Sequence, residues 1–114
     1  MKLTTVFLLL LTVTGISSGQ MLFKHGAISL SKLYKPWDLI ASPPIMVGVS
    51  IYAVSTLLWI YLLREVALSK AYPFLALSFV IVPLPSRTFF DEHLDSSYLA
   101  GMLLIVAGVV LITR

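Results

Sequence analysis

Four long stretches that are almost free of charge constrain this chain more than any other feature. Residues 3–23, 45–63 and 96–113 contain no Lys, Arg, Asp or Glu, and residues 71–90 contain only Arg87. A helix needs roughly 20 apolar residues to cross about 30 Å of hydrocarbon, and a basic side chain near the end of a span can reach the interface. The sequence therefore predicts an all-α polytopic membrane protein with four transmembrane helices in an up-down bundle.

The composition excludes several other classes of protein. Hydrophobic residues make up 59% of the chain and charged residues only 11%, whereas a soluble domain carries about 25% charged residues. The four spans leave no room for a second domain, so we expect a single domain over residues 1–114. The bases are scattered, which argues against a nucleic-acid partner. The absence of cysteine excludes disulfides, thiolate metal sites and iron-sulfur clusters.

The first stretch has an alternative interpretation as a secretory signal. Lys2 precedes an apolar run, and the small residues at 15–19 are typical of a cleavage site. However, the run continues through Phe23 to Lys24, which is long for a signal and suitable for a span. We expect this segment to be retained as the first helix.

Basic residues divide evenly between the two sides of the predicted bundle, which leaves the positive-inside rule little to act on. One side receives Lys2, Arg64, Lys70 and Arg114, and the other receives Lys24, Lys32, Lys35 and Arg87. Such a chain could insert both ways and pair with itself, or be held in one orientation by a partner. Alternatively, one basic residue at a helix end, such as Lys24, decides the insertion direction more strongly than the number of basic residues on each side.

The last stretch carries a candidate dimer interface. Four short helices fill their own centre with side chains, so a solute pathway needs a second subunit. Ala100, Gly101, Ala107 and Gly108 form two small pairs on one helix face, where backbones can approach closely. The alternative is that this face packs within the chain.

The third stretch carries a candidate hinge. Pro83 and Pro85 each remove a backbone donor and disfavour a regular helix. The sequence predicts a kink or local unwinding at this point. It could act as a hinge during transport or simply shape a fixed packing gap.

Ionisable residues are absent from the interior of every predicted span, so substrate contacts must come from other groups. Gln20 lies one turn before Lys24, and the two could bind a polar lipid head group. Arg64, Lys70 and Arg87 stand at span ends, where they could meet a lipid phosphate or merely anchor the helices. Ser17 is one of several hydroxyls in the spans, although such hydroxyls most often bond back to their own helix.

Chemistry on a substrate is not indicated. Three of the five acids lie with His93 in residues 91–95, but ligands this close in sequence, without a second cluster, are weak support for a metal site. No nucleophile-base pair or glycine-rich phosphate loop can be assembled. We expect no metal, no cofactor and no enzymatic activity.

Three segments carry a family resemblance. Residues 19–24, 71–80 and 99–108 resemble the small members of the drug/metabolite transporter superfamily, which includes the small multidrug resistance and EamA-like proteins. Within it, the chain is most similar to the paired subunits of aminoarabinose-phospho-undecaprenol flippases. Pro83 and Pro85 depart from the pattern of those subunits.

The resemblance implies a function and a site. The glutamate with which the small multidrug exporters bind cations and protons is matched by Ile16, and the tryptophan that follows their site tyrosine, here Tyr72, is matched by Leu75. The implied protein is a bacterial inner-membrane flippase subunit that moves a polyprenyl-phosphate-linked sugar as a homodimer or as a heterodimer with a related four-helix subunit. Gln20 and Tyr72 would receive the head group. The alternatives are a small-solute or drug transporter and a non-transporting subunit of a membrane glycosyltransferase complex.

Overall fold

The computed structural model describes residues 2–30 and 35–114, and every regular element in these residues is a helix. The helices are α1 (Leu3–Ser29), α2 (Pro36–Ala41), α3 (Pro43–Leu63), α4 (Leu68–Leu75), α5 (Ser78–Ile81), α6 (Pro83–Phe89) and α7 (Ser96–Thr113). Four segments are long and apolar enough to cross a membrane, with α4 to α6 together forming the third. The predicted all-α membrane fold is confirmed.

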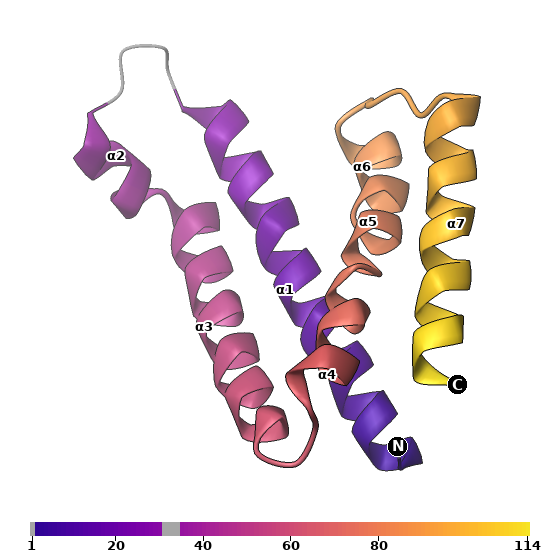
Figure 1. Cartoon of the computed structure of the whole chain (residues 1–114). Helices are drawn as coiled ribbons and strands as arrows, with labels where there is room; N and C mark the ends of the chain where they lie inside the picture. The colour runs from indigo at the N-terminus through magenta and orange to yellow at the C-terminus, as the bar shows by residue number, and fades with distance from the viewer. Residues whose placement is uncertain (1, 31–34) are drawn as a thin grey trace.

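The four segments run alternately up and down, so α1 begins and α7 ends at the same end of the bundle (Figure 1). We call the end with Lys2, the α3–α4 loop and Arg114 the proximal end. The opposite end, with Ser29 and the α6–α7 loop, is the distal end. This arrangement places Lys2 and Lys70 near one another at the proximal end, as the up-down prediction requires, whereas Lys32 lies outside the described residues.

Helix α1 extends beyond the predicted span, from Leu3 to Ser29. The predicted span ends before Lys24 because a charged side chain is expected outside the hydrocarbon. The helix itself continues, because a charged side chain does not interrupt the backbone hydrogen bonds. Helix α3 begins with Pro43 and Pro44 in its first turn, where proline has no intrahelical donor to lose.

The third segment is interrupted twice. After Pro73, the amides of Ala76 and Leu77 donate to carbonyls three residues back, at 3.0 and 3.1 Å, so the helix tightens there. A second interruption separates α5 from α6 at Val82, directly before Pro83. The backbone at Val82 stays helical, so the hinge predicted at Pro83 and Pro85 stays a prediction. The sequence analysis did not predict the interruption after Pro73.

Helices α1 and α3 pack closely because both present glycine at their contact. A Cβ atom added to Gly19 would lie 3.3 Å from the carbonyl oxygen of Gly48, and one added to Gly48 would lie 2.9 Å from the Phe23 ring. The Phe23 and Tyr52 rings also meet here, with centroids 6.0 Å apart. Small residues permit this kind of approach between membrane helices.

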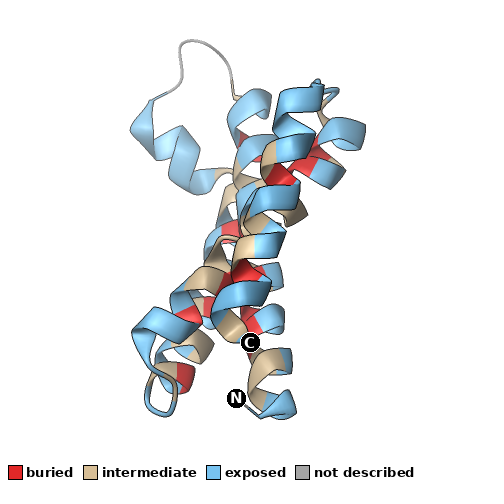
Figure 2. Cartoon of the chain, turned by 45° about the vertical axis from the view of Figure 1, so that its right-hand side comes forward, coloured by how far each residue is buried: buried red, intermediate tan, exposed pale blue. Residues whose placement is uncertain are grey.

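The apolar core joins three of the four segments near the proximal half of α1. Its buried members are Leu9, Val13, Leu62, Ala71 and Phe74. Buried residues occupy the inside of the bundle, whereas exposed residues cover its outside (Figure 2). The bundle measures 48 × 36 × 17 Å, which makes it a thin slab with few fully buried side chains.

Helix α7 is the least buried of the long helices and packs mainly against α4 and α5. Asp95 caps its start by accepting a hydrogen bond from the Tyr98 amide at 2.8 Å. The Tyr98 hydroxyl donates to the carbonyl of Phe79 at 3.3 Å. Only Met102 and Val109 are buried on this helix, so most of its apolar surface is available to lipid or to another chain.

Candidate functional site

The predicted substrate-binding residues are spread along the bundle. Gln20, Lys24 and Arg87 lie toward the distal end and are exposed, whereas Arg64 lies at the proximal end. Tyr72 stands in α4 and is 55% exposed. The structure therefore does not gather these residues into one cavity within the chain, and their role in binding stays a prediction.

Lys24 links two parts of the distal end. Its ammonium lies 4.0 Å from the carboxylate of Glu92 in the α6–α7 loop, and both side chains are about half exposed. Exposed ion pairs contribute little to stability, about 0–1 kcal/mol. Lys24 can therefore exchange this carboxylate for an anionic ligand at small cost.

A cleft opens beside these residues, between α1 and α6. Its α1 wall consists of Ser18, Met21, Leu22 and His25, and its α6 wall consists of Pro85, Phe89 and Phe90. The cleft has a volume of about 540 Å³, within the ~300–1,000 Å³ typical of small-molecule sites. We call it the distal cleft. Its lining is mostly apolar, with a histidine near its distal edge.

Ser17 differs from the nearby hydroxyls of α1. Thr12, Thr14 and Ser18 each donate to a carbonyl one turn earlier, at 2.8 to 2.9 Å. Ser17 is only 3% exposed, and its Oγ is the buried side-chain polar atom without a partner in the described part of the chain. An unpaired buried hydroxyl is unfavourable by about 1–3 kcal/mol, so Ser17 offers an unused hydrogen bond inside the bundle.

Tyr72 lies in α4, directly before Pro73, and is exposed. It lines an apolar groove of about 620 Å³ together with Ser69, Pro73, Leu75, Ala76, Ser78 and Phe79. The groove is on a membrane-spanning segment, so its natural neighbour is hydrocarbon. Such a groove suits the apolar part of an amphiphile better than its head.

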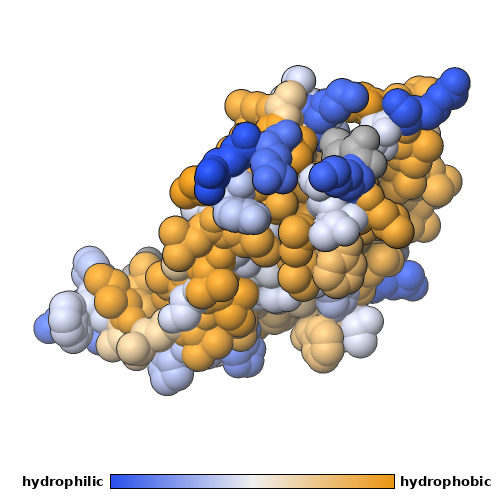
Figure 3. Space-filling model, turned by 90° about the horizontal axis from the view of Figure 1, so that it is seen from below, coloured by the Kyte–Doolittle hydropathy of each residue, from blue (hydrophilic) through white to orange (hydrophobic). Residues whose placement is uncertain are grey.

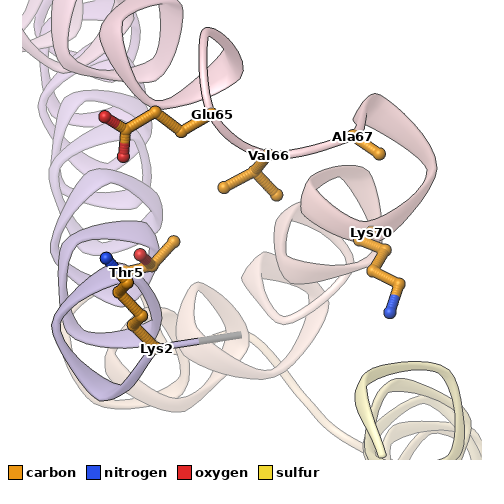
Figure 4. A pocket seen from close by; sticks show the side chains of 6 residues that line it. All are labelled: Lys2, Thr5, Glu65, Val66, Ala67 and Lys70. Carbon is orange, nitrogen blue, oxygen red and sulfur yellow. The ribbon is translucent and has the colours of Figure 1, made fainter.

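The proximal end carries a smaller, charged pocket of about 360 Å³. We call it the proximal pocket; it is lined by Lys2, Thr5, Glu65, Val66, Ala67 and Lys70. Lys2 directly precedes α1, Thr5 stands on α1, Lys70 stands on α4, and the α3–α4 loop lies between them (Figure 4). The sequence had indicated Lys70 as a phosphate contact but not Thr5 or Glu65. The only sequence feature that could have indicated this pocket is the mixture of basic and acidic residues at Arg64, Glu65 and Lys70.

The small residues of α7 are not packed against the rest of the chain. A Cβ atom added to Gly101 or Gly108 would meet nothing within 4 Å, and Ala100 and Ala107 are exposed. The face is therefore open to a partner, but its use as a dimer interface stays a prediction. By contrast, Gly15 and Gly19 form a small-xxx-small pattern in α1 that the sequence interpretation overlooked, and there the close packing is within the chain.

No metal centre is evident in the parts of the chain that the structure describes, where no three His, Asp or Glu side chains gather. The acids of residues 91–95 have other roles. Glu92 pairs with Lys24, Asp95 caps α7, and Asp91 adopts a left-handed backbone conformation with φ of 56°.

Sequence comparison places this arrangement in a known group of proteins. The EamA-like transporter family matches residues 2–114. The chain belongs to that family. This EamA-like chain is thus a multi-pass membrane protein, and the predicted family resemblance is confirmed.

Curated relatives of the EamA-like chain carry a more specific name. A protein of Pseudomonas aeruginosa (strain UCBPP-PA14) is 45% identical over 84 residues, which cover 74% of this chain and 67% of the relative. One of Aeromonas hydrophila is 36% identical over 110 residues, 94% of this chain and 95% of the relative. Both are named probable 4-amino-4-deoxy-L-arabinose-phosphoundecaprenol flippase subunit ArnE. No solved structure matches the chain.

Proposed function

We propose that this chain is a subunit of a bacterial inner-membrane flippase that moves a polyprenyl-phosphate-linked aminoarabinose between leaflets. The observation that carries the proposal is the match to the Aeromonas hydrophila flippase subunit, which extends over 94% of this chain and 95% of the relative. A similarity over nearly the full length of both proteins includes all four spans and their connections.

The physical task of such a flippase agrees with the distribution of polar groups. A charged head group is costly to carry through hydrocarbon, so it needs polar contacts at both interfaces and a protected path between them. Lys24, Gln20 and Arg87 are exposed toward the distal end, and Ser17 offers a free hydroxyl farther in. The polyprenyl chain would stay in lipid, along apolar surfaces such as the groove beside Tyr72.

The thinness of the bundle supports a second subunit. A slab 17 Å thick cannot enclose a sugar-phosphate head group on all sides, and the small-residue face of α7 is open. The functional unit we propose is a dimer, either of this chain or with a related four-helix subunit. It acts without a cofactor and leaves its substrate chemically unchanged.

Reconstitution tests this proposal. Proteoliposomes that contain the chain and its partner should translocate the aminoarabinose lipid, measured by the accessibility of its amine to an impermeant reagent. Gln20→Leu and Arg87→Ala should each slow translocation about tenfold, the loss expected for one hydrogen bond to a charged group. Ser50→Ala, an exposed change on α3 whose hydroxyl donates to the carbonyl of Met46 in its own helix, serves as the control.

Two results would contradict the proposal. Unchanged translocation rates in both variants would show that Gln20 and Arg87 do not contact the head group. Absence of lipid translocation combined with altered drug susceptibility in cells that overexpress the protein would instead favour a small-solute transporter.

A further inference from the structure

The proximal pocket combines charges of both signs at one end of the bundle. Two ammonium groups come from Lys2 and Lys70, and one carboxylate comes from Glu65. They belong to α1, α4 and the α3–α4 loop, so segments far apart in sequence bring them together. Of the residues that the sequence indicated for lipid contact, only Lys70 lines this pocket.

These charges do not neutralise one another. Glu65 forms no ion pair with Lys2 or Lys70, and the pair between Lys24 and Glu92 is the only one within residues 2–30 and 35–114. In Figure 4, Lys2 and Lys70 stand on opposite sides of the pocket, with Glu65 on the loop above Lys2. The pocket therefore presents separate positive and negative groups to a ligand.

An apolar residue of the pocket lining holds the α3–α4 loop in place. Val66 lines the pocket and also packs against the core cluster that includes Leu9 and Leu62. The loop that carries Glu65 is thereby held against α1. Its first turn is also bonded, because the amides of Glu65 and Val66 donate to the carbonyl of Leu62 at 3.1 Å. Glu65 is thus attached to a fixed backbone and not to a long free loop.

The position of the pocket matches that of a lipid head group. It lies at the ends of the apolar spans, where α1 begins and where α3 and α4 are joined. Seen from this end, the most strongly hydrophilic groups lie along one edge of a face that is otherwise mostly hydrophobic, and further hydrophilic groups lie at its other edges (Figure 3). A ligand in the proximal pocket keeps its charged part in the interface while its apolar part enters the bilayer.

Resting on the proposed function, we propose that the proximal pocket binds the zwitterionic head group of an amino-sugar phosphate lipid and that Glu65 selects for the amine. Lys2 and Lys70 contact the phosphate, and the Glu65 carboxylate accepts hydrogen bonds from the sugar ammonium. Charge-assisted hydrogen bonds of this kind are stronger than neutral ones. A site with two lysines alone would bind any lipid phosphate, so the carboxylate supplies the discrimination.

The test compares two lipids that differ in one group. Proteoliposomes that contain the full chain and its partner receive either aminoarabinose-phosphoundecaprenol or its analogue with hydroxyl in place of the amine. The wild type should translocate the amino lipid faster. Glu65→Gln should lower that preference about tenfold while it leaves the rate for the hydroxyl lipid unchanged, and Lys70→Gln should slow both lipids equally.

Matched variants separate recognition from folding. Glu65→Asp keeps the charge and should retain most of the preference. Asp91→Asn removes a carboxylate at the distal end, at a position whose left-handed backbone asparagine accepts, and should change nothing. If Glu65→Gln and Glu65→Asp reduce transport of both lipids alike, the hypothesis that the Glu65 carboxylate recognises the amine is wrong, and Glu65 has a structural role.

The outcomes also distinguish this inference from the proposed function. If the wild type translocates neither lipid, the proposed function fails and the inference fails with it. If the wild type translocates both lipids at equal rates, or if Glu65→Gln keeps the preference, the inference is overturned while the flippase function stands.

Discussion

At the scale of single residues, Ser17 shows how a side chain of unremarkable type acquires a special environment. The spans contain many hydroxyls, and most of those described donate to the preceding turn, as Thr12 and Thr14 do. Ser17 is buried, as Thr12 is, but leaves its hydroxyl unpaired. A sequence pattern cannot distinguish these cases, because the difference lies in the rotamer and in what packs beside it.

Ser17→Ala should therefore raise stability and lower activity. Removal of an unsatisfied buried hydroxyl should increase the free energy of unfolding by about 1 kcal/mol, measured by thermal unfolding in detergent with circular dichroism. If the hydroxyl contacts the substrate, lipid translocation should slow in the same variant.

Ser86→Ala is the matched control for this change. Ser86 is also buried, at 4% exposed, but its hydroxyl donates to the carbonyl of Val82 at 2.8 Å, so its loss should not stabilise the protein. A Ser17→Ala variant that is less stable than the wild type would show that the hydroxyl has a partner.

At the scale of helices, the contact between α1 and α3 organises the bundle more than any other pair. Gly15, Gly19 and Gly26 on α1 and Gly48 on α3 all lie where an added Cβ would meet the other helix. The sequence interpretation placed the close-packing glycines in α7 instead. Both helices offer small residues at helical spacing, and only the tertiary arrangement decides which set is used within the chain.

Gly48→Leu should accordingly destabilise the α1–α3 pair. A side chain at this position must displace Phe23 and Leu22, whose atoms would lie 2.9 to 3.1 Å from the new Cβ. Overpacking of this kind is unfavourable by about 1–3 kcal/mol. The variant should unfold at a lower temperature in detergent, and an unchanged transition would show that the helices separate easily.

The interruptions of the third segment belong to the same scale. A kink or local unwinding was predicted at Pro83 and Pro85; α6 begins at Pro83, but the backbone of Val82 directly before it stays helical, so the hinge stays a prediction. The tightening after Pro73 was not predicted, because the sequence analysis considered only Pro83 and Pro85 in this stretch. The structure begins α4 at Leu68, which puts Pro73 inside the helix.

At the scale of the whole molecule, the bundle is thin and unevenly packed. Helix α7 contacts mainly the segment directly before it, and its glycines face open space. In a membrane, helix association depends on close packing and not on a hydrophobic driving force. An unpacked small-residue face is therefore the natural place for a second subunit.

Gly108→Leu should disrupt this assembly without unfolding the chain. No atom lies within 4 Å of the added Cβ, so thermal unfolding of the isolated subunit should be unchanged. Dimer formation, measured by cross-linking in membranes or by native mass spectrometry, should fall about tenfold if about 1.4 kcal/mol of packing is lost. Equal dimerisation in the variant and the wild type would move the interface to another face.

The sequence alone determined the four membrane spans and their alternation, because the thickness of the hydrocarbon sets the length of an apolar run and short connections set its direction. It also determined the family, which residues 2–114 match. Only the tertiary structure decided that α1 and α3 share the close contact, that Ser17 is left unpaired, and that Lys2, Glu65 and Lys70 line one pocket. Hydropathy measures how each residue interacts with the solvent, whereas these features depend on which helix faces which.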